Sequence, residues 1–246
     1  GKQRDEIARK RRHGMGYLGL GSALSMMGIV YGDEESLKFT DEVSRILAEI
    51  GWQVGIELSK EKGPAPIMDE DFEVTASMLL MRPEMKKDGI KVGDKIKGKV
   101  LLGKYSRYMQ QFPGTIQDRI AKFGCRFTHH SSIAPTGTIS LSLANNASNG
   151  IEPSFAHHYS RNVIREGKKT KEKVDVFSYE LLAYRALVNP KAMPFSENED
   201  EKLPECFIDS STIKAKAHVD IQAAAQKWID SSISKTINVP TDYDYE

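Results

Sequence analysis

Residues Arg126–Phe155 read RFTHHSSIAPTGTISLSLANNASNGIEPSF, with one arginine, one glutamate and no lysine, in a chain that is 28% charged. Two apolar or β-branched pieces, Ser131–Ala134 and Ile139–Leu143, flank a turn at Pro135–Thr138. A second turn follows at Asn145–Gly150. The pattern therefore predicts short strand-like pieces that carry two loops.

Loops rich in Gly, Thr, Ser and Asn suit an anionic ligand such as a phosphate. Glycine lets the backbone approach a ligand closely, and successive N–H groups and hydroxyls can surround a phosphate. The dipole of a nearby helix N-terminus would add to this attraction. The same residues are also the usual formers of tight turns, and PTGT is much less specific than a complete GxxxxGK motif. From the residues alone, a phosphate loop and two ordinary turns both remain open.

The composition indicates a mixed α/β protein with a hydrophobic core. Its 246 residues, 39% of them hydrophobic, suffice for one large domain or two small ones. With 35 basic and 34 acidic residues, no overall field attracts the chain to nucleic acid or to a membrane. The two cysteines, Cys125 and Cys206, fit a reducing compartment rather than a disulfide scaffold or a four-thiolate zinc site. Because no membrane-spanning run and no secretory signal is visible, we expect a soluble, cytoplasmic protein.

A literal GxGxxG at Gly14–Gly19 does not indicate a dinucleotide site. That motif must follow a buried strand, whereas the residues before it are the basic Arg9–His13. The charged segment Gly1–His13 is typical of the solvated face of a helix, although such a cluster can also contact nucleic acid. The glycines fit a buried helix at Tyr17–Val30, whose small residues permit close packing.

The rest of the sequence predicts further helices, strands and loops. Acidic residues at Asp33–Ser36 begin an amphipathic helix that reaches Ile50 or one turn beyond. Apolar residues alternate with lysines in Ile90–Leu102, which predicts an exposed hairpin inserted near residues 88–103. We further expect a loop at Gly63–Pro66, a helix at Gln117–Phe123 closed by Gly124, a solvated basic loop at Arg161–Lys173 (including Arg165, Lys168 and Lys169), a helix at Val174–Leu187, a surface loop at Asn189–Pro204, a helix at Val219–Ile229, and a strand at Ser231–Val239 ended by Pro240.

Two histidine pairs, His129–His130 and His157–His158, could be taken for metal ligands. Adjacent residues on a strand point to opposite faces, so neither pair can bind one ion from one side. Cys125 and His129 have the i, i+4 spacing of a helix, but we expect a strand there. The sequence therefore predicts no metal site.

Four motifs occur together in one order along the chain. They are RRHGMGYLGLG at Arg11–Gly21, APTGTIS at Ala134–Ser140, NGIEP at Asn149–Pro153, and IDSSIS at Ile229–Ser234 followed by Asn238. In this order the chain resembles the C-terminal part of the catalytic barrel of ribonucleotide reductases. The strings THHSSIAPTGTIS and FAHHYSRNV most resemble the class II, adenosylcobalamin-dependent enzymes. The resemblance covers nearly the whole chain, residues 1–246, and is weakest in the lysine-rich segment around Gly93.

The resemblance implies an α/β fold, the C-terminal portion of a ten-stranded barrel made of two parallel five-stranded halves. It implies a ribonucleoside di- or triphosphate substrate and, for the complete enzyme, adenosylcobalamin as cofactor. The resemblance also implies a loop that binds the substrate's phosphates, formed by Pro135, Thr136, Gly137, Thr138, Ile139 and Ser140. Binding would occur chiefly through the N–H groups of Gly137, Thr138 and Ile139 and through the Thr138 hydroxyl. A neighbouring loop, with a further contact to substrate, would be shaped by Asn149, Gly150 and Glu152.

The chain departs from the family pattern in its cysteines. It has no Asn-x-Cys-x-Glu segment, no pair of redox cysteines, no specificity-effector region and no C-terminal cysteine pair. Cys125 lies in FGCRF, where the family places no catalytic thiol, and Cys206 lies in a loop rich in Pro and Glu, so we assign neither a catalytic role. We therefore expect half of an active site, completed by a missing N-terminal half in the same chain or in a separate subunit. The alternative is a non-catalytic nucleotide-binding or assembly subunit derived from the same barrel.

Overall fold

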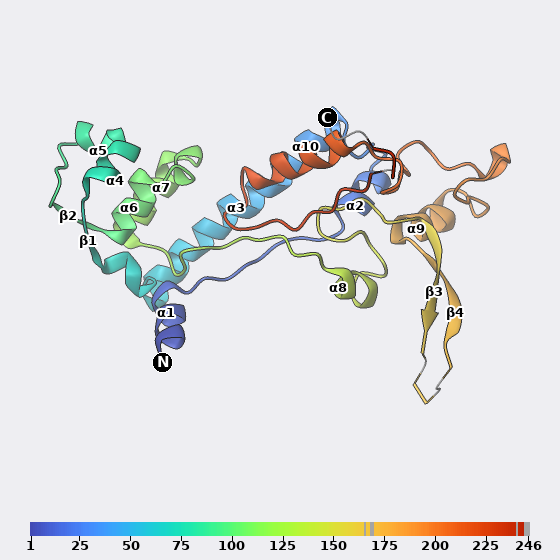
Figure 1. The fold of residues 1–246 in the computed structure, drawn as a ribbon, viewed down its shortest axis with the longest axis horizontal. Helices are drawn as coiled ribbons and strands as arrows, with labels where there is room; N and C mark the ends of the chain where they lie inside the picture. The colour runs from blue at the N-terminus through green and yellow to red at the C-terminus, as the bar shows by residue number, and fades with distance from the viewer. Residues whose placement is uncertain (165, 168–169, 240, 244–246) are drawn as a thin grey trace. The chain divides into compact units, whose positions relative to one another are not determined.

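The computed structural model describes residues 1–164, 166–167, 170–239 and 241–243, and Figure 1 shows their elements along the chain. These residues form two compact units. Unit 1 comprises Gly1–Met15 and Arg45–Ser131, and unit 2 comprises Gly16–Ser44 and the described residues from Ser132 onward. Within the described ranges, no helix has both the length and the apolar character needed to cross a membrane.

Unit 1 is mainly helical. Its elements are α1 (Lys2–Lys10), the later part of α3 (Glu34–Lys62), η1 (Pro66–Asp69), β1 (Asp71–Glu73), α4 (Ala76–Met81), α5 (Pro83–Lys87), β2 (Lys95–Lys97), α6 (Gly98–Tyr105), η2 (Met109–Gln111) and α7 (Gly114–Phe123). The prediction of a solvated N-terminal helix is confirmed, because α1 buries none of its residues. The predicted helix before Gly124 is confirmed as α7, and the N–H of Gly124, at φ 71°, donates to Ile120 O at 2.8 Å.

Helix α3 continues three turns beyond the expected end at Ile50. Its two glycines in unit 1 are places of close packing rather than helix breakers. A Cβ at Gly51 would lie 1.7 Å from Nε2 of His130, and a Cβ at Gly55 would lie 2.4 Å from Sγ of Cys125. The glycines therefore let the segment around residues 125–130 lie directly against the helix.

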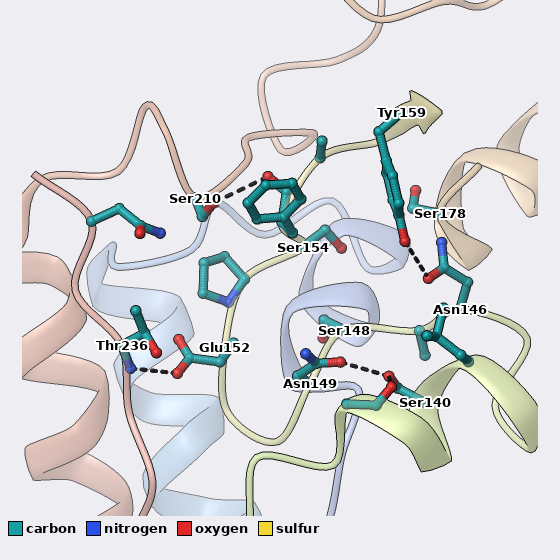
Figure 2. A pocket seen from close by; sticks show the side chains of 17 residues that line it. Ser140, Asn146, Ser148, Asn149, Glu152, Ser154, Tyr159, Ser178, Ser210 and Thr236 are labelled. Carbon is teal, nitrogen blue, oxygen red and sulfur yellow. Dashed lines mark hydrogen bonds between the residues drawn. The ribbon is translucent and has the colours of Figure 1, made fainter. Parts of the chain in front are cut away.

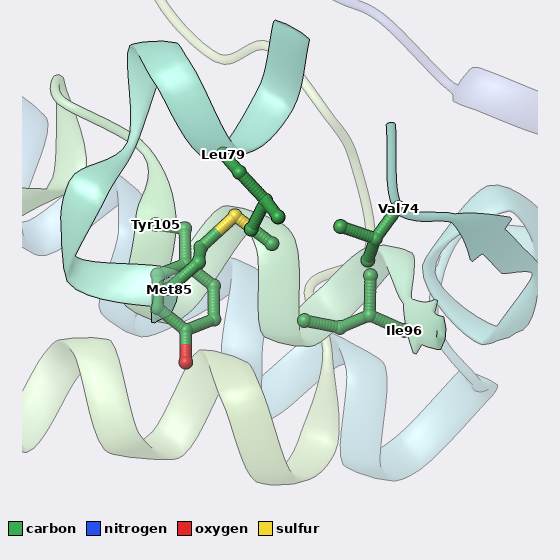
Figure 3. Packing of buried hydrophobic residues seen from close by; sticks show 5 residues of the cluster. All are labelled: Val74, Leu79, Met85, Ile96 and Tyr105. Atoms are coloured by element: carbon green, nitrogen blue, oxygen red, sulfur yellow. The ribbon is translucent and has the colours of Figure 1, made fainter. Parts of the chain in front are cut away.

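The predicted hairpin at Ile90–Leu102 is wrong. Strand β2 pairs antiparallel with the upstream strand β1, with Ile96 opposite Phe72. The residues after β2 form α6, and its Val100 and Leu101 pack against a small apolar core (Figure 3). The alternation of apolar and lysine residues thus corresponds to strand β2 only. The residues after β2 form a helix instead, because their apolar side chains pack into this core. The buried residues of this core are Val74, Leu79, Met85, Ile96 and Tyr105.

Unit 2 contains the motifs that carry the resemblance. Its elements are α2 (Leu20–Met26), the first part of α3, α8 (Gly137–Ser142), β3 (His158–Val163), β4 (Glu172–Phe177), α9 (Tyr179–Leu187), η3 (Glu199–Glu201) and α10 (Ala215–Gln226). The buried, glycine-containing helix expected at Tyr17–Val30 is the shorter α2. Its Gly21 has the expected role, since a Cβ there would lie 2.6 Å from the carbonyl oxygen of Glu152.

Three predicted elements of unit 2 need correction. The piece Ile139–Leu143, expected to be strand-like, lies mostly in helix α8, because a short apolar run does not by itself distinguish strand from helix. The basic segment expected to be a loop contributes to β3 and β4, which pair antiparallel, although Arg165, Lys168 and Lys169 lie outside the described residues. The helix expected from Val174 begins only at Tyr179, because Ser178 caps it by accepting a hydrogen bond from the N–H of Leu181 at 3.3 Å.

The ten-stranded barrel is not formed by the described residues, whose sheets are two antiparallel strand pairs, β1–β2 and β3–β4. Among these described residues, parallel pairing is limited to single bridges, Met15 with Ser131 in unit 1 and Ile133 with Ile233 in unit 2. Around the second bridge, Ile133 N–H donates to Ser232 O at 3.1 Å and Ser234 N–H donates to Ile133 O at 2.8 Å. The expected strand Ser231–Val239 is thus reduced to one bridged residue, and its expected end, Pro240, lies outside the described residues.

Candidate functional site

A pocket of about 310 Å³ opens in unit 2 beside α8 (Figure 2). Its volume lies at the lower end of the range of small-molecule sites. Six stretches of chain meet there: α8, residues 146–156, the start of β3, the cap of α9, the segment around residue 210, and residues 236–238. The lining residues are Gly137, Ser140, Leu141, Asn146, Ala147, Ser148, Asn149, Glu152, Pro153, Ser154, Phe155, Ala156, Tyr159, Ser178, Ser210, Thr236 and Asn238.

The backbone on either side of α8 adopts unusual conformations. Thr136, Asn145 and Asn146 have φ angles of 57°, 48° and 62°, and the described residues include only two other non-glycine residues with positive φ. Such conformations cost energy for residues with a side chain and persist only where surrounding contacts impose them. They are concentrated at the two turns that the sequence places around the pocket.

Hydrogen bonds join the two predicted loops to each other. The Ser140 hydroxyl donates to Oδ1 of Asn149 at 2.6 Å. The N–H of Gly150 donates to Oγ1 of Thr136 at 2.8 Å, and the N–H of Asn146 donates to the carbonyl of Ser140 at 2.8 Å. The turn before α8 and the turn at residues 145–150 are therefore one connected structure.

The first turn of α8 presents backbone donors. An α-helix leaves its first N–H groups without intrahelical partners, here those of Gly137, Thr138 and Ile139. Gly137 lines the pocket and is not among the glycines with positive φ. A Cβ on Gly137 would have no heavy atom nearer than Nδ2 of Asn149 at 4.0 Å, so the space beside it is open to a ligand.

The structure brings some of the predicted residues to the pocket and leaves others outside. Its lining includes four of them, Gly137, Ser140, Asn149 and Glu152. Two others, Thr136 and Gly150, connect the loops behind it. The remaining three, Pro135, Thr138 and Ile139, are exposed and do not belong to the lining.

Glu152 is held by two consecutive residues of the C-terminal segment. Its Oε1 accepts the backbone N–H of Thr236 at 2.6 Å (Figure 2), and its Oε2 accepts from Nζ of Lys235 at 2.5 Å. The Lys235 side chain is only 2% exposed. Its ammonium also contacts Nδ1 of His218 at 2.6 Å and donates to the carbonyl of Thr236 at 2.9 Å. Three acceptors thus satisfy one buried cation.

Burial shifts the pKa values of His218 and Lys235, which lie next to Glu152 in this cluster. Burial, with the charge of Lys235 as a smaller cause, lowers the pKa of His218 to about 4. The imidazole is therefore neutral near pH 7, and its Nδ1 can accept from the ammonium. Burial also lowers the pKa of Lys235, opposed by its hydrogen bond to Glu152. The Tyr31 hydroxyl donates to Ile151 O at 2.6 Å, and burial raises the pKa of Tyr31 above its usual value.

A second buried carboxylate, that of Glu180, contacts the pocket wall through Ser154. It accepts from the hydroxyl of Ser22 at 2.7 Å and from that of Ser154, and it lies 3.3 Å from Nδ1 of His157. Burial disfavours its charge, but the hydrogen bonds from His157, Ser154 and Ser22 outweigh burial and lower the pKa of Glu180. Because Ser154 lines the pocket, this network fixes α2, α9 and the pocket wall together.

Sequence reasoning missed part of the lining. Tyr159 donates to Oδ1 of Asn146 at 3.3 Å, and the Ser210 hydroxyl donates to the carbonyl of Phe155 at 3.0 Å. The missed residues are Asn146, Tyr159, Ser178, Ser210, Thr236 and Asn238. Asn146 lies in the predicted turn Asn145–Gly150, Tyr159 lies in the string FAHHYSRNV, and Asn238 follows the last motif. No local pattern marks Ser178, Ser210 and Thr236, because they reach the pocket through long-range packing.

Cys125 and Cys206 are both buried. Burial raises the pKa of the Cys206 thiol, whose sulfur lies 3.5 Å from Ser25 O. Among the described residues, no group of three or more His, Cys, Asp or Glu side chains is placed to hold a metal ion.

Known proteins match the chain over nearly its full length. A vitamin B12-dependent ribonucleoside-diphosphate reductase of Mycobacterium tuberculosis is 24% identical over 237 residues, which cover 94% of this chain and 27% of that protein. The protein of the same name from Thermoplasma acidophilum is 25% identical over 246 residues, with 94% and 25% covered. The ribonucleoside-diphosphate reductase subunit alpha of Chlamydia pneumoniae is 26% identical over 239 residues, with 91% and 21% covered. The chain thus spans about a quarter of the length of these relatives.

The family match extends beyond the motifs around the pocket to the whole chain. A sequence model described as "Ribonucleotide reductase, barrel domain" matches residues 1–246. Both units of the structure, and the pocket with its two connected loops, therefore lie inside the matched region. This chain belongs to the ribonucleotide reductase barrel-domain family.

Proposed function

We propose that this chain is part of a cobalamin-dependent ribonucleotide reductase and that its pocket binds the phosphates of a ribonucleoside di- or triphosphate. The observation that carries the proposal is the arrangement of Gly137 at the start of α8, open to the pocket and joined to the Asn149 loop through Ser140. The family match supports it, because this is the loop to which the resemblance assigns the substrate's phosphates.

The pocket would bind phosphate with neutral donors. The N–H groups in the first turn of α8 and the hydroxyl and amide side chains of the lining can donate to phosphate oxygens, and the helix dipole favours an anion there. Asn149 would be oriented by its bond to Ser140, which is nearly fully buried. In this proposal Thr136 and Gly150 shape the loop, while the backbone of Thr138 and Ile139 supplies donors.

The names of the relatives support adenosylcobalamin as the cofactor of the complete enzyme. When bound, that cofactor supplies the radical that starts reduction. The pocket of about 310 Å³ does not fit a corrinoid, which is far larger than a nucleotide's phosphates. We therefore assign no cobalamin contact to its residues, and we assign the radical and redox cysteines to the rest of the reductase.

Binding of nucleotides by the chain tests the proposal. Calorimetric titration with CDP and CTP should show binding that Gly137→Val removes, because the valine side chain would occupy the space for the anion. Gly114→Val is a matched control, since Gly114 also begins a helix, α7, and a Cβ there would meet nothing within 4 Å. Equal binding by the wild-type chain and Gly137→Val would disprove the loop assignment.

Reconstitution separates an enzyme part from a nucleotide-binding or assembly subunit. The chain should restore ribonucleotide reduction when mixed with the cysteine-bearing remainder of a related reductase and adenosylcobalamin. Gly137→Val should fail in the same mixture, and Gly114→Val should succeed. Nucleotide binding without any restored reduction would instead favour the non-catalytic subunit.

A further inference from the structure

The charge of the pocket is unusual for an anion site. Among the described residues that line it, Glu152 is the single charged side chain, and its charge has the sign that repels phosphate. No lysine or arginine stands in this lining. A pocket that binds polyanions through neutral donors alone requires its one carboxylate to be compensated, because like charges repel strongly where water is partly excluded.

Lys235 lies where such compensation is needed. Its ammonium contacts the Glu152 carboxylate at 2.5 Å and is itself almost completely buried, so solvent and salt screen the pair only weakly. The next residue, Thr236, lines the pocket and donates its N–H to the other carboxylate oxygen at 2.6 Å. Both oxygens of Glu152 therefore face donors of the C-terminal segment.

His218 adds to this arrangement without adding charge. Its Nδ1 lies 2.6 Å from the Lys235 ammonium, and its side chain is fully buried. The only chemically sensible hydrogen bond is from the ammonium to an unprotonated Nδ1, which keeps the ring neutral. The cluster of Glu152, Lys235 and His218 thus has a net charge of zero.

We propose that Lys235 is a positioning and charge-compensating residue of the pocket, which fixes the Glu152 loop and cancels its carboxylate so that a polyphosphate can enter. The inference rests on the proposed function of the pocket. According to this inference, Lys235, which lies 83 positions from Glu152 in the sequence, sets whether the pocket prefers neutral or anionic ligands. Lys235 itself does not belong to the pocket lining.

A charge series tests this inference. Lys235→Met, the wild-type chain, Glu152→Gln and the double variant give the Lys235–Glu152 pair net charges of −1, 0, +1 and 0. Relative to the wild-type chain, CTP affinity should fall on the order of tenfold in Lys235→Met, rise in Glu152→Gln, and return close to wild type in the double variant. Affinity for uncharged cytidine should change much less across the series. Loss of structure would instead weaken the binding of CTP and of cytidine alike.

Two controls keep the outcomes distinct. Lys216→Met removes an equal charge from an exposed lysine that pairs with Asp220 at 2.5 Å, and it should leave CTP binding unchanged. Thermal unfolding of every variant reports folding, and the neutral double variant provides a test if Lys235→Met does not fold. If the wild-type chain binds CTP but affinity does not follow the charge series, this inference is wrong and the proposed function stands. If neither the wild-type chain nor Glu152→Gln binds CTP, the proposed function fails and the inference fails with it.

Discussion

The hydroxyl of Ser140 on α8 donates to Oδ1 of Asn149 at 2.6 Å, and this bond joins two loops that the sequence shows as separate turns. Ser140 is almost fully buried, so water does not compete for the bond. The pair orients the Asn149 amide at the pocket wall and holds the start of α8 beside it.

Removing the Ser140 hydroxyl should loosen the pocket. Ser140→Ala should lower the free energy of unfolding by roughly 1 kcal/mol and weaken nucleotide binding, because Asn149 loses its buried partner. Ser142→Ala is the control, since the Ser142 hydroxyl donates to Thr138 O on the exposed side of the same helix. Chemical denaturation and calorimetry measure the two effects. Equal effects of both substitutions would show that the Ser140–Asn149 bond has no special role.

Gly21 should tolerate no side chain. A Cβ there would lie 2.6 Å from Glu152 O and 2.7 Å from the Cα of Pro153, which are backbone atoms that cannot turn away. Gly21→Ala should therefore destabilise the chain by about 1–3 kcal/mol, although alanine favours helices. Gly114→Ala provides the contrast, because its Cβ would meet nothing within 4 Å and should be neutral or stabilising. Thermal unfolding that ranks the two variants the other way would contradict the close packing of α2.

His218 should make folding stability depend on acidity. Its pKa is about 4 in the folded protein and 6.5 as an unperturbed side chain, so the unfolded chain binds a proton first as the pH falls. The contribution of neutral His218 is fully present above pH 6.5 and is lost progressively as the pH falls to about 4. His218→Gln should therefore flatten the decline of the unfolding midpoint across this interval. An unchanged slope in the variant would show that His218 is not the group that titrates.

Glu180 should be more important for stability than any exposed carboxylate. Glu180→Ala would leave the buried polar groups of Ser22, Ser154 and His157 without their shared acceptor. We expect a loss of roughly 3–5 kcal/mol, as for other buried partners removed singly. Glu199→Ala, which removes an exposed partner of Lys202, should cost at most about 1 kcal/mol. Urea unfolding of the two variants gives both values, and similar losses would contradict a buried network.

Elements with strong local signals, and the family to which the chain belongs, could be predicted from the order of the amino acids alone. The glycine that closes α7 and the solvated charge of α1 could be predicted because each depends on neighbouring residues. The ordered motifs identified the family, and the match over residues 1–246 confirms it. Where local signals are ambiguous, the predictions are wrong: the apolar run in α8 fits a strand as well as a helix, and the helix expected from Val174 begins only after the capping Ser178.

Which distant residues meet depends on long-range packing, for which the sequence carries no local signal. Strand β2 pairs with β1 rather than with its sequence neighbours, because the apolar core around Met85 buries both strands' inward side chains. The parallel strands that the family resemblance implies remain single bridges among the described residues. The contact between Lys235 and Glu152 has no local signature either. A buried cation requires acceptors from wherever the fold can bring them, and their identity depends on packing between segments rather than on spacing along the chain.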